Sequence, residues 1–338
     1  MQRAQSMTYK HFVNNSWIVP ASIRVQQLQC KWLPFAPFAV LRIPNAAAPL
    51  HNWKMNSRLP LATAAWHATL NLGFARVGER TVLCENRHMG PLRVQKALYP
   101  EGDAVCQAIV LHPPSGIAGG DHLVISAAVA TGAHAQLTTP GAGKWYRSSG
   151  ELATQRIDLS ASEGATLEWL PQESIVFDGA RARMETRVSL AADSRFIGWD
   201  ILCLGRAAAG ERFEHGHFGL FLTVDRDKRP LWLERGQFSG NDPILTSPTG
   251  WAGHTVCGTL LCSFPELPQH ATALLEALRT IAPTDGAPHG ITALPGLLVA
   301  RYLGDSSEAG RLWFVELWKI LRPVCCGRPA VLPRIWNT

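Results

Sequence analysis

Hydrophobic and polar residues alternate along most of the chain after residue 60, which is the pattern of strands with one buried face. In residues 66–74, WHATLNLGF, every second residue is apolar, and His, Thr, Asn and Gly stand between them. Further runs of this kind are TVLCEN, LRVQKALY, AVCQAIVL, HLVISAAV, AHAQLTT, TQRIDLSA, ATLEWL, SIVF, METRVSLA, RFIGWDILCL, FGLFLTV and PLWLERG. Because these short runs follow one another without intervening helices, the pattern predicts an all-β body instead of βαβ units.

Three segments about 30 residues apart share a rhythm of strand, small polar turn and strand. They read VATGAHAQLTTPG, SASEGATLEWLPQE and LAADSRFIGWDIL, with Gly132, Gly164 and Ser194 in the turn. A period of this length is typical of stacked, solenoid-like β layers. Similar hairpins that arose independently would give the same pattern, so the repeat alone leaves both interpretations open.

Two helices are predicted near the C-terminal end. The first spans residues 266–281, where apolar residues recur on one face at helical spacing. The second spans residues 305–322 and begins with a capping box, in which Asp305 is the N-cap and Glu308 occupies N3. Pro323 is expected to end this helix. Such a pair can cover a sheet edge or offer a docking face to a partner.

The first 60 residues differ from the rest of the chain. Residues 31–50 are apolar but are interrupted by four prolines, which fit neither a helix nor a paired strand. The segment also lacks the order of a signal peptide. We therefore predict a poorly ordered N-terminal extension over residues 1–60 and a single β-rich domain over 61–338. Met55 lies just before the patterned part, so residues 1–54 are either a tail or an upstream reading of the gene.

Composition narrows the class of protein. The chain is 46% hydrophobic and 17% charged, so it can bury a substantial core. Its net charge of +6 is scattered, without a Lys/Arg stripe interleaved with aromatic residues, which argues against nucleic-acid binding. No apolar run reaches about 18 residues, so no membrane-spanning helix is expected. Eight cysteines without a C-x-x-C pair are typical of a reduced, cytoplasmic protein.

The motifs of common enzymes are missing or incomplete. The segment TTPGAGKWYRSSG resembles a phosphate-binding loop, but Thr138 and Trp145 stand where that loop needs a glycine and a Ser or Thr. The sequence contains no G-x-S-x-G or H-E-x-x-H motif. His215 and His217 would share one face of a strand and could contact a metal, or they are simply two exposed strand histidines. The sequence therefore offers no convincing enzyme site.

Isolated acids within apolar strands are the remaining candidates for chemistry. A carboxylate among large apolar residues must be paired, protonated or in contact with a wet cavity. Each acid could form an ion pair with Arg206, Arg235 or another base, or could be an oxygen ligand for a transient divalent metal. Such acids are found at Asp121, Glu168, Asp200 and Glu234.

Several long segments of the chain, in order, resemble the family of the urease accessory protein UreD, also called UreH. They are LHPPSGIAGGDHL, TTPGAGKWYRS, LEWLPQESIVFDGARAR, GWDILCLGR and VLPRIWNT, and the resemblance covers about residues 61–338. It implies a scaffold without enzymatic activity that binds apo-urease, together with UreF and the GTPase UreG, and promotes nickel delivery to the urease active site. The implied fold is a stack of β-sheets similar to a β-helix, with two C-terminal α-helices that help to dock UreF.

The resemblance also implies site residues. By position in the family motifs, Asp121, Asp200 and Glu234 are expected to contact nickel as it passes along an internal tunnel. No permanently bound cofactor is implied, only transient Ni²⁺. Two other functions stay open at this point: a metal-dependent hydrolase on a β scaffold, and an interaction module unrelated to urease.

Overall fold

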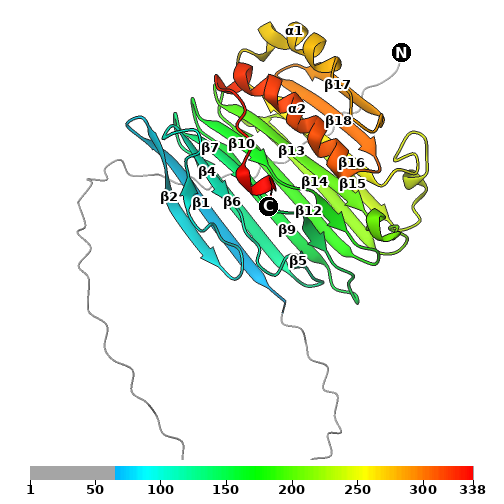
Figure 1. Cartoon of the computed structure of the whole chain (residues 1–338). Helices are drawn as coiled ribbons and strands as arrows, with labels where there is room; N and C mark the ends of the chain where they lie inside the picture. Colours follow the sequence, from blue (N-terminus) through cyan, green and yellow to red (C-terminus); the bar gives the residue numbers. More distant parts are fainter. Residues whose placement is uncertain (1–64, 338) are drawn as a thin grey trace, which may run out of the picture. The chain divides into compact units, whose positions relative to one another are not determined.

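The computed structural model describes residues 65–337 of the chain. The expected N-terminal extension over residues 1–60 therefore lies outside the described residues. In the described part, the strands form one 7-stranded and one 11-stranded sheet (Figure 1). None of the described helices is long and apolar enough to cross a membrane.

The 7-stranded sheet, called here the first sheet, has the order β15-β14-β12-β9-β6-β1-β2. Its strands are β1 (His67–Val77), β2 (Arg80–Met89), β6 (His122–Val129), β9 (Ala153–Ala161), β12 (Arg181–Leu190), β14 (His217–Arg226) and β15 (Arg229–Ser239).

The 11-stranded sheet, called here the second sheet, has a main path of β17-β18-β16-β13-β10-β7-β4-β3. The strands of this path are β3 (Ala97–Leu98), β4 (Val105–Ile109), β7 (His134–Thr138), β10 (Thr166–Leu170), β13 (Arg195–Leu204), β16 (Val256–Ser263), β17 (His289–Leu294) and β18 (Leu297–Gly304). The short strands that pair beside it are β5 (Gly116–Ile117), β8 (Gly143–Trp145) and β11 (Ser174–Val176).

The weak repeat in the sequence corresponds to a real structural repeat. Strands β6, β9 and β12 pair in parallel in the first sheet, and β7, β10 and β13 pair in parallel in the second. Each repeat therefore gives one strand to each sheet, and the predicted solenoid-like stack is confirmed. The register places Asp193 opposite Gly132 and Gly164. The turn residue of the third repeat is therefore Asp193, and the predicted Ser194 is one residue too late. The Asp193 carboxylate accepts a hydrogen bond from the Gly164 N–H and thereby joins two stacked turns.

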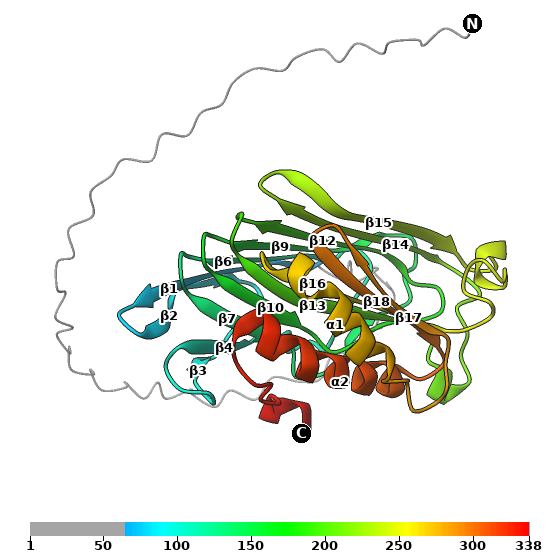
Figure 2. The same ribbon diagram turned by 90° about the horizontal axis from the view of Figure 1, so that it is seen from above.

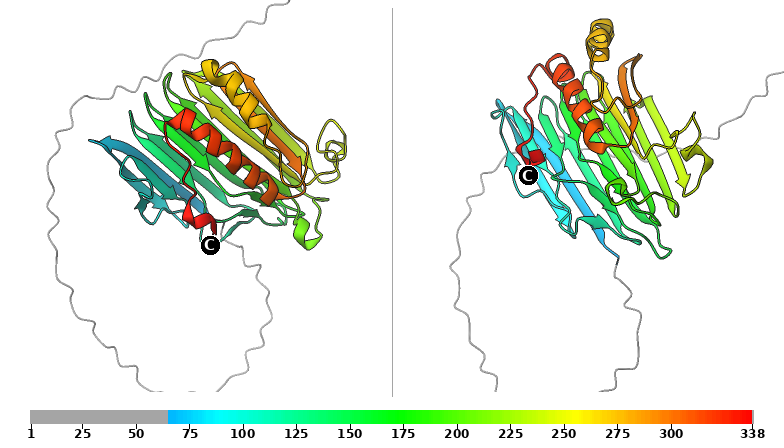
Figure 3. Two further views of the ribbon diagram at one scale, coloured as in Figure 1. Left: turned by 45° about the horizontal axis from the view of Figure 1, so that its top comes forward. Right: turned by 45° about the vertical axis from the view of Figure 1, so that its right-hand side comes forward.

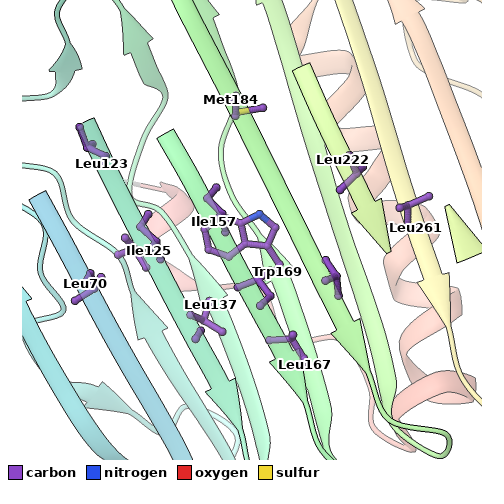
Figure 4. Close-up of a cluster of buried hydrophobic side chains, with 14 of the residues drawn as sticks. Leu70, Leu123, Ile125, Leu137, Ile157, Leu167, Trp169, Met184, Leu222 and Leu261 are labelled. Atoms are coloured by element: carbon purple, nitrogen blue, oxygen red, sulfur yellow. The ribbon is translucent and has the colours of Figure 1, made fainter. Parts of the chain in front are cut away.

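The main hydrophobic core lies between the two sheets, because each strand turns alternate apolar side chains toward the other sheet. Figure 4 shows this layer, in which Leu123 and Ile157 of the first sheet approach Leu137 and Trp169 of the second. The alternation predicted for residues 66–74 is confirmed from Ala68 onward, whereas Trp66 is half exposed.

A second core lies between the outer face of the second sheet and two helices, α1 (Leu267–Arg279) and α2 (Ser307–Cys326) (Figures 2 and 3). Trp199 and Leu260 of the sheet pack there against Phe314 and Trp318 of α2. The predicted pair of helices is thus confirmed. The described chain also has three short 3₁₀ helices, at Ala207–Ala209, Pro243–Leu245 and Arg334–Asn337.

Both predicted ends of α2 were wrong. Its N-cap is Ser306, whose hydroxyl accepts a hydrogen bond from the Ala309 N–H, while Asp305 accepts hydrogen bonds from a neighbouring loop. Pro323 lies inside the helix, which continues to Cys326 and ends at Gly327 with a left-handed backbone. The helix tolerates the N–H missing at Pro323 because its last turns are buried in the second core.

Two strand predictions also differ from the structure. Residues 92–99 were predicted as one strand, but only Ala97–Leu98 pairs there, and Arg93 makes an isolated bridge. Leu92 and Val94 are buried in the core, so their alternation reflects burial without strand pairing. The sequence analysis also did not identify β16, β17 and β18, which complete the second sheet beside β13.

Candidate functional site: a cavity between the two sheets lined by two acids

The structure separates Asp121 from the other two acids expected to contact nickel. Asp121 is buried at the corner before β6, and its two carboxylate oxygens accept hydrogen bonds from the backbone N–H groups of Trp66 and Ala118, each at 2.8 Å. Its own carbonyl accepts a bond from the Thr154 N–H of β9. Asp121 therefore stabilises the backbone at this corner of the stack. A contact between Asp121 and nickel stays a prediction.

Strand geometry turns Asp200 toward the space between the sheets. Along β13, Leu202 and Leu204 belong to the core between the sheets, whereas Trp199 and Ile201 belong to the core beneath the helices. Successive side chains of a strand point to opposite faces. Asp200 has the parity of the first pair, so its carboxylate faces the first sheet.

Asp200 and Glu234 line one cavity of about 630 Å³ between the two sheets. Asp200 comes from the second sheet and Glu234 from β15 of the first, where Glu234 pairs in register with the core residue Leu222. Thr259 and Arg301 also line this cavity. The structure therefore brings together two of the three expected site residues across the gap between the sheets.

Asp200 has no basic partner among the described side chains. Burial raises the pKa of its carboxyl to about 7, and the negative charge of Glu234 adds to this effect. Both causes act in the same direction, because an anion is disfavoured in a site of low polarity and beside another anion. Asp200 is thus an acid in contact with a cavity, one of the cases that the sequence analysis left open.

Glu234, in contrast, is already paired. Its Oε1 atom accepts a hydrogen bond from Arg301 Nη1 at 2.6 Å, and its Oε2 atom accepts one from Trp232 Nε1 at 3.2 Å. The sequence analysis allowed an ion pair with Arg206, Arg235 or another base, and at Glu234 this other base is Arg301, whereas Arg206 pairs with Glu211.

Asp200 also lines a second, smaller cavity of about 190 Å³, and Met184 is the other residue that both cavities share. The smaller cavity is lined by parts of LHPPSGIAGGDHL and TTPGAGKWYRSSG, two of the segments that carry the family resemblance. His112 and Gln172 line it as well, and their buried Nε2 atoms have no hydrogen-bond partner among the described residues. Trp169 lines it too, and its indole N–H faces Asp200 and partly offsets the rise in the pKa of that carboxyl. Buried polar atoms beside a cavity favour a polar occupant, such as water.

Glu168, the fourth isolated acid, is paired with basic side chains, unlike Asp200. Its parity on β10 turns it toward α2, where its carboxylate accepts hydrogen bonds from Arg322, Trp318 Nε1 and His134 Nε2. Burial alone would raise its pKa, but His134 and Arg322 lower it to about 2. Glu168, His134 and Cys326 place three possible metal-ligand atoms within 4.8 Å of one another. Because the carboxylate is saturated by donors, we assign this cluster to the anchoring of α2 and not to metal binding.

The two histidines considered as a metal pair do not act together. β14 begins at His217, and Gly216 has a positive φ of 96°, so His215 is not on the same strand face. His215 Nδ1 lies 3.1 Å from Asp178 Oδ2, whereas His217 Nδ1 lies 3.4 Å from Ser239 Oγ. The premise of a shared strand face was wrong, because the chain turns between the two residues.

The sequence analysis missed the two arginines that decide the state of these acids. Arg301 is 67 residues from Glu234, and Arg322 is 154 residues from Glu168. No local pattern joins such pairs. The one available signal was that an arginine interrupts an apolar run at each position, in LLVARYLG and in LWKILRPV.

The described residues thus define a β-stack protein with a cavity between its sheets that is lined by two acids, and with two helices on the outer face of one sheet. The family model described as UreD urease accessory protein matches residues 67–337. The chain therefore belongs to the UreD family of urease accessory proteins, and its role lies in urease maturation.

Three named relatives agree with this assignment, and each bears the name urease accessory protein UreD. The protein of Dechloromonas aromatica (strain RCB) is 75% identical over 288 residues, which are 84% of this chain and 100% of the relative. The protein of Azoarcus sp. (strain BH72) is 52% identical over 280 residues, which are 83% of this chain and 97% of the relative. The protein of Pseudomonas fluorescens (strain Pf-5) is 53% identical, and the alignment covers 83% of this chain and 99% of the relative.

Proposed function

We propose that this protein is a scaffold without enzymatic activity that binds apo-urease together with UreF and UreG, and that nickel passes through its interior by way of Asp200 and Glu234. The observation that carries the proposal is the position of Asp200. Its carboxylate has no basic partner among the described side chains, and Asp200 lines both the cavity of about 630 Å³ and the cavity of about 190 Å³.

The chemistry of this cavity suits transfer better than storage. Carboxylate and hydroxyl oxygens bind Ni²⁺ less tightly than imidazole or thiolate groups do, so a metal held by Asp200 and Glu234 can be released again. Cys257 and His289 also line the cavity, but burial raises the pKa of the Cys257 thiol, which disfavours the thiolate, and His289 Nδ1 is engaged by the Ala287 carbonyl oxygen at 2.8 Å. The apolar side chains of the lining, among them Leu222 and Phe238, add no ligands. We therefore expect a short-lived contact and no permanently bound metal.

The test is the substitution Asp200→Asn, which keeps the shape of the side chain and removes its charge. We expect urease matured with this variant to contain less nickel and to be less active, while apo-urease, UreF and UreG still co-purify with the variant. The matched control is Asp158→Asn on the outer face of the first sheet, where Asp158 pairs with Arg156 at 2.8 Å. Nickel content equal to that given by the wild type would refute passage through Asp200.

The sequence left two other functions open: an interaction module unrelated to urease and a metal-dependent hydrolase. Membership of the UreD family excludes an interaction module unrelated to urease. A metal-dependent hydrolase on the same scaffold would show turnover by the purified protein alone, and we expect none. A cytoplasmic location also stays a prediction, in keeping with the free cysteines of residues 65–337.

A further inference from the structure

We propose that Arg301 is a tethered counter-cation, which neutralises Glu234 until an incoming divalent cation displaces it and so keeps the metal's stay in the cavity short. This inference rests on the proposed passage of nickel past Asp200 and Glu234. It adds a residue to which neither the family resemblance nor the comparisons assign a role.

Arg301 lies in the same row of the second sheet as Asp200. Asp200 pairs in register with Thr259 on β16, and Thr259 pairs in register with Arg301 on β18. Adjacent strands are about 4.8 Å apart, so the backbones of Asp200 and Arg301 are separated by roughly 10 Å. The three side chains point to the same face, toward the first sheet. Arg301 is thus anchored beside the acids without being paired to Asp200.

The contacts of Arg301 span the cavity. Its Nη1 atom donates to Glu234 Oε1 at 2.6 Å across the two sheets and to Thr259 Oγ1 at 2.9 Å within its own sheet. The Glu234 side chain is only 16% exposed, whereas the Arg301 side chain is 43% exposed. The guanidinium can therefore leave Glu234 and turn toward solvent, while the carboxylate has no comparable freedom.

Charge determines what this arrangement does to a metal ion. With Arg301 in place, a cation that approaches Glu234 meets a carboxylate that is already neutralised, and it is repelled by the guanidinium. When the metal does bind Glu234, Arg301 stays tethered nearby and competes for the same oxygen. Without Arg301, Glu234 would lose its ion-pair partner and would face the cavity together with Asp200, which favours retention of a divalent cation even though Arg235 also lines the cavity.

The test compares Ni²⁺ binding by the full-length wild-type protein and by Arg301→Gln, using equilibrium dialysis for affinity and a chromogenic chelator for release. We expect Arg301→Gln to bind Ni²⁺ roughly tenfold more tightly or better and to release it correspondingly more slowly, because one repelling charge is lost. The double variant Arg301→Gln/Glu234→Gln should lose this gain. Arg301→Lys keeps the charge and should stay close to the wild type.

The matched control is Arg76→Gln, because Arg76 is a partly exposed arginine that pairs with Glu79 at 2.7 Å away from the cavity. Its Ni²⁺ affinity should equal that of the wild type. A purely structural role for Arg301 would lower the melting temperature of Arg301→Gln without raising Ni²⁺ affinity, and that result would overturn the proposal. If Arg301→Gln fails to fold, the test rests on Arg301→Lys. An Arg301→Lys protein that binds Ni²⁺ clearly more weakly than the wild type would also overturn the proposal.

The outcomes for Arg301 and for the proposed passage are distinguishable. Tighter Ni²⁺ binding by Arg301→Gln together with normal nickel delivery by Asp200→Asn would refute passage through Asp200 but support the counter-cation. Unchanged Ni²⁺ binding by Arg301→Gln together with impaired delivery by Asp200→Asn would refute the counter-cation and leave the passage supported.

Discussion

The buried ion pair between Glu168 and Arg322 makes a quantitative prediction about stability. Both side chains are fully buried, and Arg322 Nη2 lies 3.0 Å from Glu168 Oε1. The substitution Glu168→Gln keeps the volume of the side chain but, among residues 65–337, leaves Arg322 with Glu101 as its one carboxylate partner, at 2.7 Å. Breaking a buried ion pair by removing one charge costs about 3–5 kcal/mol. We expect the lower end of this range, because Glu101 still compensates part of the arginine charge.

The pKa of Glu168 gives a second estimate of the same quantity. This pKa is lowered from an ordinary value of 4.5 to about 2, and a tenfold change in proton affinity is worth about 1.4 kcal/mol, so the folded state gains about 3 kcal/mol. The folded state holds the proton less tightly than the unfolded state does. The stabilisation is therefore complete above pH 4.5 and is lost as the pH falls toward 2.

The assay is urea denaturation of the wild type and of Glu168→Gln, followed by tryptophan fluorescence and circular dichroism. At pH 7 the free energy of unfolding should be about 3 kcal/mol smaller for the variant, and the difference should shrink as the pH is lowered toward 3. The control is Glu316→Gln on α2, whose partner Lys319 is exposed, and it should change stability by at most about 1 kcal/mol. A loss below about 1 kcal/mol for Glu168→Gln, or a loss that does not depend on pH, would refute this reasoning.

Two further predictions concern the stacked turns. Asp121→Asn should lower the free energy of unfolding by about 1–3 kcal/mol, because one of the two backbone N–H groups then faces an NH₂ donor in place of an acceptor and the other keeps only a neutral acceptor; urea denaturation measures this. Gly205→Ala should lower it by about 1–3 kcal/mol, because Gly205 has a φ of 82° and a Cβ there would overlap the carbonyl oxygen of Glu211; a thermal melt measures this.

Each of these two predictions has its own control. Asp158→Asn, on the outer face of the first sheet, should leave stability nearly unchanged, and an equal loss in both aspartate variants would contradict the special role of Asp121. Gly78→Ala is the control for Gly205→Ala, because Gly78 also has a positive φ but has no atom within 4 Å of an added Cβ. If both glycine variants lose the same stability, overlap with Glu211 is not the cause.

The sequence by itself determined the class of fold. Alternation over two residues marks the strands, since one face of each strand must be buried. The repeat of about 30 residues is compatible with stacked layers, and the family resemblance favoured this interpretation over independent hairpins. Apolar neighbours marked Asp121, Glu168, Asp200 and Glu234 as unusual acids, and the family resemblance selected three of them. These signals are local, so they survive in a linear sequence.

Only the tertiary structure decided what each acid does. Strand parity and register place Asp200 against a cavity and Glu168 against α2, although both acids lie in similar apolar strands. The bases that complete the site, Arg301 and Arg322, come from elements 67 and 154 residues from their partners. An acid is neutralised by whichever base folding brings within about 3–4 Å, and that distance is set by the pairing of distant strands and helices. For this reason the sequence could identify the acids but not their partners.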